Sequence, residues 1–228
     1  MQNTIYRVKE VIASNREDAN AEWDAYYKSN YIRRSWKQAV MRRIIEYCYT
    51  YKGYTHNYAT SFQLPKILDF GCGSSPLARE IPFSHYTGID INTSKIWFMT
   101  GKQIPNARFI AGGIETLYVM NHDYDLFILS EVIEHLTLEE IERLLSEARR
   151  VMNDNGYLII ATPNYDSPLW HLIEWLQKTI QPKGHMSDHK THFNSLGLDI
   201  LVNKLGFIKI NTSKVMFGCD LISCYEKK

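Results

Sequence analysis

The chain has 228 residues, 45% of them hydrophobic, and a formal net charge of +1 at pH 7. This length suits one α/β domain with an appended segment, and the near-neutral charge gives no general preference for nucleic acid or an anionic surface. No apolar run approaches the roughly 20 residues of a membrane-spanning helix, and the amino terminus is too polar for a secretory signal. The four cysteines form no Cys-x-x-Cys pair, so we expect free thiols and a cytoplasmic protein without an integral membrane segment.

Residues 1–64 are predicted to form helices that act as a cap or lid. Apolar side chains recur at spacings of three and four between residues 31 and 51, which is typical of one helical face. Several arginines and lysines lie largely off that stripe. They form either a solvated basic face or a surface that presents cations to an acidic substrate, and the sequence leaves both interpretations open.

From residue 65 to residue 228 the pattern alternates between strand and helix, which indicates a parallel sheet. Thr137 and Glu140 have the spacing of a capping box at the start of a helix, and Asn155 with Gly156 is expected to close that helix. A further helix is expected from residue 193 to about residue 205. The predicted strands lie at 66–70, 85–90, 107–111, 124–130 and 156–162, followed by an antiparallel hairpin at 207–215 and 217–225.

The most informative stretch surrounds the end of the first predicted strand. Asp69 lies near that end, Gly71 and Gly73 follow it, and Asp90 ends the next strand. Glycine lets a ligand lie against the main chain, and a carboxylate can accept hydrogen bonds from both hydroxyls of a ribose. Because the carboxyl ends of parallel strands share one edge of a sheet, these residues predict a cleft for an adenosine-containing cofactor. A pyrophosphate-binding Gly-x-Gly-x-x-Gly turn is excluded, since Pro76 stands at the third glycine position.

The stretch Leu68-Asp69-Phe70-Gly71-Cys72-Gly73 resembles the first motif of the class I S-adenosylmethionine-dependent methyltransferases, and the resemblance covers about residues 64–226. It implies a doubly wound, seven-stranded, mostly parallel sheet of the Rossmann-like methyltransferase type, with strand order 3-2-1-4-5-7-6. It also implies that the domain at 65–228 binds S-adenosylmethionine, with the N-terminal helical cap beside it. The implied cofactor-binding residues are Asp69, Gly71, Cys72, Gly73, Asp90, Ile91, Gly113, Ile114 and Ser130.

The third motif departs from the pattern of that family. The family usually has an acid after the third strand that binds the adenine amino group, whereas this chain has Gly113 there. We therefore expect adenine to contact the backbone of Gly113 and Ile114, or the side chain of Glu115.

Two acids and a histidine follow the fourth predicted strand. If the chain turns helically there, Glu131, Glu134 and His135 share one face. The three side chains could bind Mg²⁺, Mn²⁺ or Zn²⁺, which oxygen and nitrogen ligands suit. Alternatively, His135 could act as a general base whose tautomer a glutamate fixes. The group could also only cap the helix and order the cofactor cleft, and the sequence leaves the three interpretations open.

Two subgroups of the family share this layout. One is the ubiquinone-type O-methyltransferases, whose matching segments here are Glu131–His135, Thr162-Pro163-Asn164 and His189–Phe193. The other is the small-RNA 3′-terminal 2′-O-methyltransferases, in which two Glu and two His hold Mg²⁺. The residues that match this second set, as metal ligands and as catalytic residues, are Glu131, Glu134, His135 and His189. The residues after His189 depart from the RNA subgroup's pattern, which favours the small-molecule subgroup.

The leading hypothesis is therefore methyl transfer to the hydroxyl of a small-molecule acceptor. The alternatives are a metal-dependent RNA 2′-O-methyltransferase and a non-catalytic regulatory protein that binds the cofactor. A helical lid insert is expected at about 165–190, where the apolar positions of 168–176 recur at helical spacing. That helix belongs either to the core or to a wall of the substrate pocket.

Overall fold

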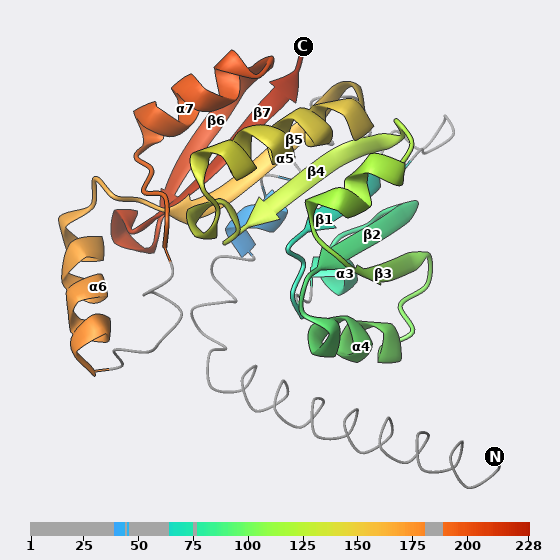
Figure 1. The fold of residues 1–228 in the computed structure, drawn as a ribbon, viewed down its shortest axis with the longest axis horizontal. Helices are drawn as coiled ribbons and strands as arrows, with labels where there is room; N and C mark the ends of the chain where they lie inside the picture. The colour runs from blue at the N-terminus through green and yellow to red at the C-terminus, as the bar shows by residue number, and fades with distance from the viewer. Residues whose placement is uncertain (1–38, 44, 46–63, 75–76, 181–188) are drawn as a thin grey trace, which may run out of the picture.

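The computed structural model describes residues 39–43, 45, 64–74, 77–180 and 189–228. They form a seven-stranded sheet in the order β3-β2-β1-β4-β5-β7-β6, in which β7 runs antiparallel to β5 and β6 (Figure 1). This confirms the predicted fold and strand order. The strands are β1 (Lys66–Phe70), β2 (His85–Asp90), β3 (Ala107–Ala111), β4 (Tyr124–Ser130), β5 (Met152–Pro163), β6 (Phe207–Val215) and β7 (Asp220–Lys227).

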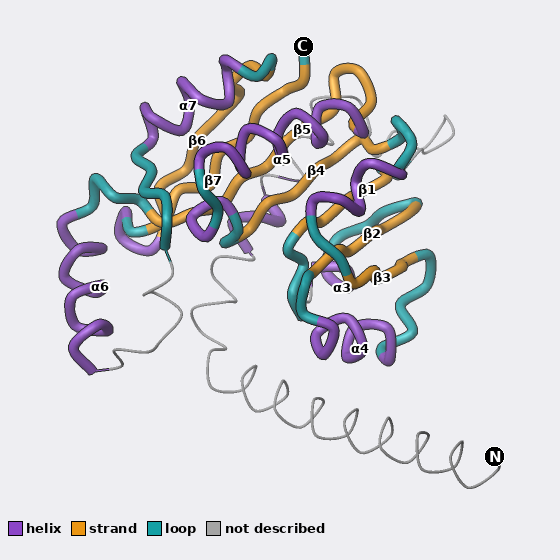
Figure 2. The backbone as a smooth tube through the Cα atoms, viewed as in Figure 1, coloured by secondary structure: helices purple, strands orange, loops and turns teal. Residues whose placement is uncertain are grey.

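Helices cover both faces of the sheet (Figure 2). One face carries α5 (Leu138–Val151), α7 (Ser195–Lys204) and the 3₁₀-helix η1 (Ile114–Val119). The other face carries α3 (Leu77–Glu80) and the helical residues 39–43. The remaining helices are α4 (Thr93–Gly101), α6 (Pro168–Ile180), which stands apart from the sheet in Figure 1, and the short η2 (Ile133–His135) and η4 (Met216–Gly218).

The central strands are almost wholly apolar because the sheet is buried on both sides. In β4, Phe127 and Leu129 face the α5 side, whereas Leu126 and Ile128 face the α3 side. The predicted capping box is present at the start of α5. Thr137 Oγ1 accepts a hydrogen bond from the Glu140 N–H, and Glu140 Oε2 accepts one from the Thr137 N–H.

Two predicted boundaries were wrong. Helix α5 ends at Val151, and Asn155 (φ +56°) lies instead within β5, near a shift in its register with β4. The last strand begins at Asp220, after η4, in which Met216 and Phe217 have φ of +51° and +57°.

Most of the predicted cap at 1–64 lies outside the described residues. Within the described part, Met41 and Ile45 are buried against the same side of the sheet as Ile67 of β1. Cys72, Cys219 and Cys224 are buried free thiols. In the described ranges, we find no helix with the length and apolar character needed to cross a bilayer.

Candidate active site

The loop after β1 is tied to the end of β2. The N–H groups of Gly71 and Cys72 donate to the Ile89 carbonyl over 2.7 and 2.9 Å. Gly71 has a φ of +74°, and a Cβ added there would lie 2.3 Å from Val132 Cγ2. Only glycine therefore lets this loop pack against the segment that follows β4, and the carboxyl ends of β1, β2 and β4 meet at this point.

Asp90 is held at the centre of that edge. Its side chain is buried, with 8% exposure; its Oδ2 accepts from the Gly73 N–H and its Oδ1 from the Asn92 N–H, both over 2.8 Å. Each carboxylate oxygen retains capacity for a further hydrogen bond, so the carboxylate suits a vicinal diol. Ile91, the next residue, is 80% exposed and offers an apolar surface beside it. This arrangement fits an adenosine, with its ribose on Asp90 and its base against Ile91.

Asp69 supports the loop from inside the protein. Its carboxyl group is buried, and Tyr86 donates its hydroxyl to Oδ2. Burial raises the pKa of Asp69 from 3.8 to about 7, with a smaller contribution from the charge of Asp90 and against the lowering effect of the Tyr86 hydrogen bond. Cys72 is also buried, and burial is the main cause that raises the pKa of its thiol. Side chains of both residues therefore belong to the base of the loop, and direct cofactor contact by them stays a prediction.

The turn after β3 is closed by Glu115. Its Oε1 accepts from the Gly113 N–H over 2.8 Å, and backbone N–H groups of Glu115 and Gly113 lower the pKa of this carboxyl group. The Gly112 N–H donates to the Asp90 carbonyl, which places the turn beside the end of β2. Ile114 begins η1, and Ser130 is the last residue of β4. Their contacts with cofactor stay predictions.

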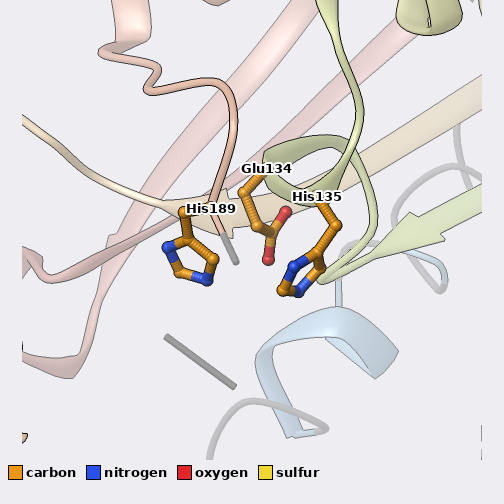
Figure 3. Close-up of side chains that lie close together, drawn as sticks. All are labelled: Glu134, His135 and His189. Atoms are coloured by element: carbon orange, nitrogen blue, oxygen red, sulfur yellow. The ribbon is translucent and has the colours of Figure 1, made fainter. Parts of the chain in front are cut away.

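A carboxylate and two imidazoles converge beyond the end of β4. One donor atom each of Glu134, His135 and His189 lies within 4.8 Å of the others, and Figure 3 shows the Glu134 carboxylate between the two rings. Glu134 is buried, and its Oε2 accepts from Thr162 Oγ1 over 3.1 Å. The two imidazole rings meet edge to face, with centroids 4.9 Å apart.

Backbone hydrogen bonds bring His189 to this place. The N–H groups of Lys190 and Thr191 both donate to the Glu134 carbonyl, over 2.7 and 3.2 Å. Thr191 Oγ1 donates to the Leu136 carbonyl over 2.6 Å. Residues more than 50 positions apart in the sequence are thereby fixed side by side.

Glu131 lies outside the group formed by Glu134, His135 and His189. It has a φ of +57°, and its N–H donates to the Ala161 carbonyl over 2.9 Å. The helical turn assumed from the sequence is absent, because η2 begins only at Ile133. The structure thus brings together three of the four predicted residues. A left-handed glutamate costs on the order of 1 kcal/mol or more, and such residues are concentrated at functional sites.

A second layer around His189 was not anticipated from the sequence. Tyr165 donates or accepts a hydrogen bond at His189 Nδ1 over 2.7 Å, and Trp170 stacks parallel to the His189 ring with centroids 6.3 Å apart. Glu174 lies 3.4 Å from the Tyr165 hydroxyl. The available signals were that Tyr165 directly follows Thr162-Pro163-Asn164 and that Trp170 and Glu174 are four residues apart on one helix.

The group is equipped to take up a proton. Burial lowers the pKa of His189, and the neighbouring His135 lowers it further. A neutral imidazole has a lone pair that can accept a proton or bind a cation. Because the group follows β4, it lies at the same edge of the sheet as Asp90.

Comparisons with known proteins bear on the fold and on the class of protein. Residues 68–160 match a family model described as "Methyltransferase domain". The chain is 31% identical over 112 residues to a fatty-acid O-methyltransferase of Mycolicibacterium smegmatis. It is also 31% identical over 113 residues to a phthiotriol/phenolphthiotriol dimycocerosates methyltransferase of Mycobacterium leprae. Each alignment covers 46% of this chain, which spans only 40% and 41% of the lengths of these relatives.

Solved structures share the fold. A SAM-dependent methyltransferase from Archaeoglobus fulgidus has a TM-score of 0.61 and 22% identity, covering 90% of this chain and 99% of that one. A magnesium protoporphyrin IX methyltransferase from Synechocystis with bound SAH has a TM-score of 0.60 and 17% identity, covering 84% of each chain. The match over residues 68–160 and the shared fold support the resemblance to the class I S-adenosylmethionine-dependent methyltransferases that the sequence indicates.

Replacing Gly71 with alanine tests the packing of the cofactor loop. The substitution adds backbone strain and a methyl group 2.3 Å from Val132 Cγ2. We expect the free energy of unfolding, measured in urea, to fall by about 2–4 kcal/mol. Gly218→Ala, with φ +88° and open space around it, should lose only about 1 kcal/mol. Gly101→Ala, in open space without a left-handed φ, should lose nothing. Equal losses at Gly71 and Gly218 would refute the close contact with Val132.

The buried Asp69 makes stability depend on pH. Its carboxyl group holds a proton up to about pH 7 in the folded protein but only to about 3.8 when unfolded. The folded state therefore binds more protons in this window, and the free energy of unfolding falls as pH rises through it. Asp69→Asn removes this dependence, so its stability relative to the unchanged protein should rise by roughly 2–3 kcal/mol between pH 5 and pH 8. A constant difference between the two proteins across that range would show that Asp69 is ionised in the fold.

Proposed function

We propose that the protein transfers the methyl group of S-adenosylmethionine to a hydroxyl oxygen of a small-molecule acceptor. The observation that carries this proposal is the position of Glu134, His135 and His189 at the same sheet edge as the Asp90 loop. The names of the curated relatives, which include an O-methyltransferase, support oxygen as the accepting atom.

The roles of the residues follow from their geometry. When bound, S-adenosylmethionine supplies a methyl group on a sulfonium, which the acceptor oxygen attacks while the carbon–sulfur bond breaks and its electrons remain on sulfur. Asp90 binds the ribose, and the loop of Gly71 and Gly73 lets the cofactor approach the main chain. His135 takes the hydroxyl proton as the oxygen attacks, and the charge of Glu134 stabilises the resulting imidazolium.

The basic group favours a hydroxyl over a carboxylate as acceptor. A carboxylate is already ionised near neutral pH, whereas an alcohol or phenol must lose its proton during attack. A site that methylates carboxylates has no need of a base. We therefore place the acceptor among alcohols and phenols, although one relative is named for fatty acids.

The acceptor is also proposed to be partly apolar. Helix α6 exposes Leu172, Trp175 and Leu176, on the side away from the buried Trp170 and Glu174. Trp170 and Glu174 occupy the side of α6 that faces the histidine group, so the exposed apolar side would bind a part of the acceptor that extends beyond that group.

Cofactor binding by Asp90 and proton removal by His135 can be tested separately, the first by binding and the second by turnover. Asp90→Asn should weaken binding of S-adenosylhomocysteine, measured by calorimetry, by about tenfold or more, because a charged acceptor is lost. His135→Ala should leave that affinity unchanged but slow methyl transfer to hydroxyl acceptors by about 10²–10⁴-fold, with little effect on carboxylates. The control is His85→Ala at the opposite, amino end of β2, which should change neither.

Other outcomes identify the alternatives. Methyl transfer that requires RNA and shows salt-sensitive RNA binding would replace the small-molecule proposal with the RNA alternative. Cofactor binding without transfer to any hydroxyl, carboxylate or RNA acceptor would identify a non-catalytic protein.

A divalent cation is a second candidate for the same group. One carboxylate and two imidazoles suit Zn²⁺ or Mn²⁺, and their outer partners, Thr162 on Glu134 and Tyr165 on His189, resemble the hydrogen bonds that orient metal ligands. A cation held by Glu134, His135 and His189 would lower the pKa of the acceptor hydroxyl.

Titration of the protein with Zn²⁺ and Mn²⁺ tests this candidate. If the group is a metal site, His189→Ala should lose binding, and Glu139→Gln, on the exposed surface of α5, should keep it. Methyl transfer should then also stop when the metal is removed by a chelator. Full activity in chelator, with no saturable cation binding, would establish the metal-free base.

A further inference from the structure

The hydroxyl of Tyr165 lies between a carboxylate and the imidazole of His189. It is 2.7 Å from His189 Nδ1 and 3.4 Å from Glu174 Oε1. Glu174 is buried, with 8% exposure, and an ionised carboxylate can only accept hydrogen bonds. The carboxylate can only accept, whereas His189 can donate or accept, so both contacts are satisfied when the Tyr165 hydroxyl proton points to Glu174. The tyrosine oxygen is then left to accept a hydrogen bond from Nδ1.

The consequence for His189 is a defined tautomer. A neutral imidazole has one N–H, and if Nδ1 has that hydrogen, Nε2 has the lone pair. Figure 3 shows one ring nitrogen of His189 on the side of His135 and the other on the far side. Since Tyr165 binds Nδ1, the nitrogen toward His135 and Glu134 is Nε2.

Ring stacking keeps this arrangement in place. Tyr165 stacks on His192, with centroids 4.0 Å apart and planes 11° apart, and Trp170 lies parallel to His189. The backbone of Tyr165 is anchored as well, because its N–H donates to the Phe193 carbonyl over 3.0 Å. Trp170 and Glu174 both belong to α6, so this helix contributes two of the groups that orient His189.

We propose that Tyr165 and Glu174 are positioning residues that hold His189 in the Nδ1–H form and aim its Nε2 lone pair at the acceptor side of the site. The catalytic value of this arrangement rests on the proposed function, because an oriented lone pair matters where a proton is taken up or a cation is bound. The tautomer itself does not depend on that function.

Nuclear magnetic resonance of ¹⁵N-histidine-labelled protein at pH 8 tests the proposal directly. The chemical shifts of the two ring nitrogens should show His189 as the Nδ1–H tautomer. In Tyr165→Phe and Glu174→Met, which remove the hydroxyl and its acceptor, the Nε2–H tautomer should become the major form. The matched controls are Tyr118→Phe and Glu139→Met, on the exposed surface, which should leave the tautomer unchanged.

The two proposals fail in different ways. Nε2–H as the major form in the unchanged protein, or no change in either variant, would overturn the positioning role even if methyl transfer is found. The predicted tautomer in a protein without methyl transfer would refute the proposed function and keep the positioning role. With both correct, Tyr165→Phe should lower kcat at least tenfold and leave the affinity for S-adenosylhomocysteine unchanged. Because either substitution could also disturb folding, urea unfolding of Tyr165→Phe and Glu174→Met should show that both variants remain folded under the conditions of the measurement.

Discussion

The adjacency of β1 and β4 is the constraint on which the site depends. The chain leaves β1 toward β2 and β3 on one side of the sheet, and returns through β4 to build the other side. The segment after β1 leads to α3 on one face of the sheet, and the segment after β4 leads to α5 on the other face. The first residues of the two segments therefore lie side by side at the carboxyl ends of the strands, as at the switch point of any doubly wound sheet. Phe70 and Leu129 are paired in register, so Gly71 and Val132 come into contact just beyond them. The same geometry places Asp90 and the group of Glu134, His135 and His189 at one edge.

Hydrogen bonds between segments that are far apart in the sequence fix the rest of the site. The Glu134 carbonyl is an acceptor for two consecutive N–H groups of a segment more than 50 residues away. Asn164 acts similarly at the end of β5, since its N–H and its side-chain amide bind the carbonyls of Cys219 and Gly218. Both sets of bonds fix the backbone next to a side chain of the candidate site. The free-energy cost of orienting these side chains is therefore met during folding, which is the physical basis of preorganisation.

The fold could be predicted from the sequence because its signals are local. Five predicted strand ranges match the structure, namely 66–70, 85–90, 107–111, 124–130 and 207–215. They and the capping box depend on apolar runs and on residues within three positions of each other. The Asp90 loop was predictable for the same reason, since a strand, two glycines and a second acid are contiguous patterns. By contrast, the left-handed conformation of Glu131 has no sequence signal, and it breaks the helical spacing from which Glu131 was grouped with Glu134 and His135. Tyr165 and Glu174 could not be predicted because their meeting with His189 depends on where α6 packs.

The pairing of strand β5 affects how the chain folds during its synthesis on the ribosome. One of its edges pairs with β4, which precedes it, but its other edge pairs with β7, where Pro163 lies opposite Asp220 and Tyr157 opposite Glu226. At translation rates of about 5–20 residues per second, that second edge waits roughly 3–15 s for its partner to be synthesised. During this interval the nascent chain presents a long, apolar, unpaired strand edge, which is a template for aggregation. Ribosome-associated chaperones that shield such edges should therefore raise the yield of folded protein.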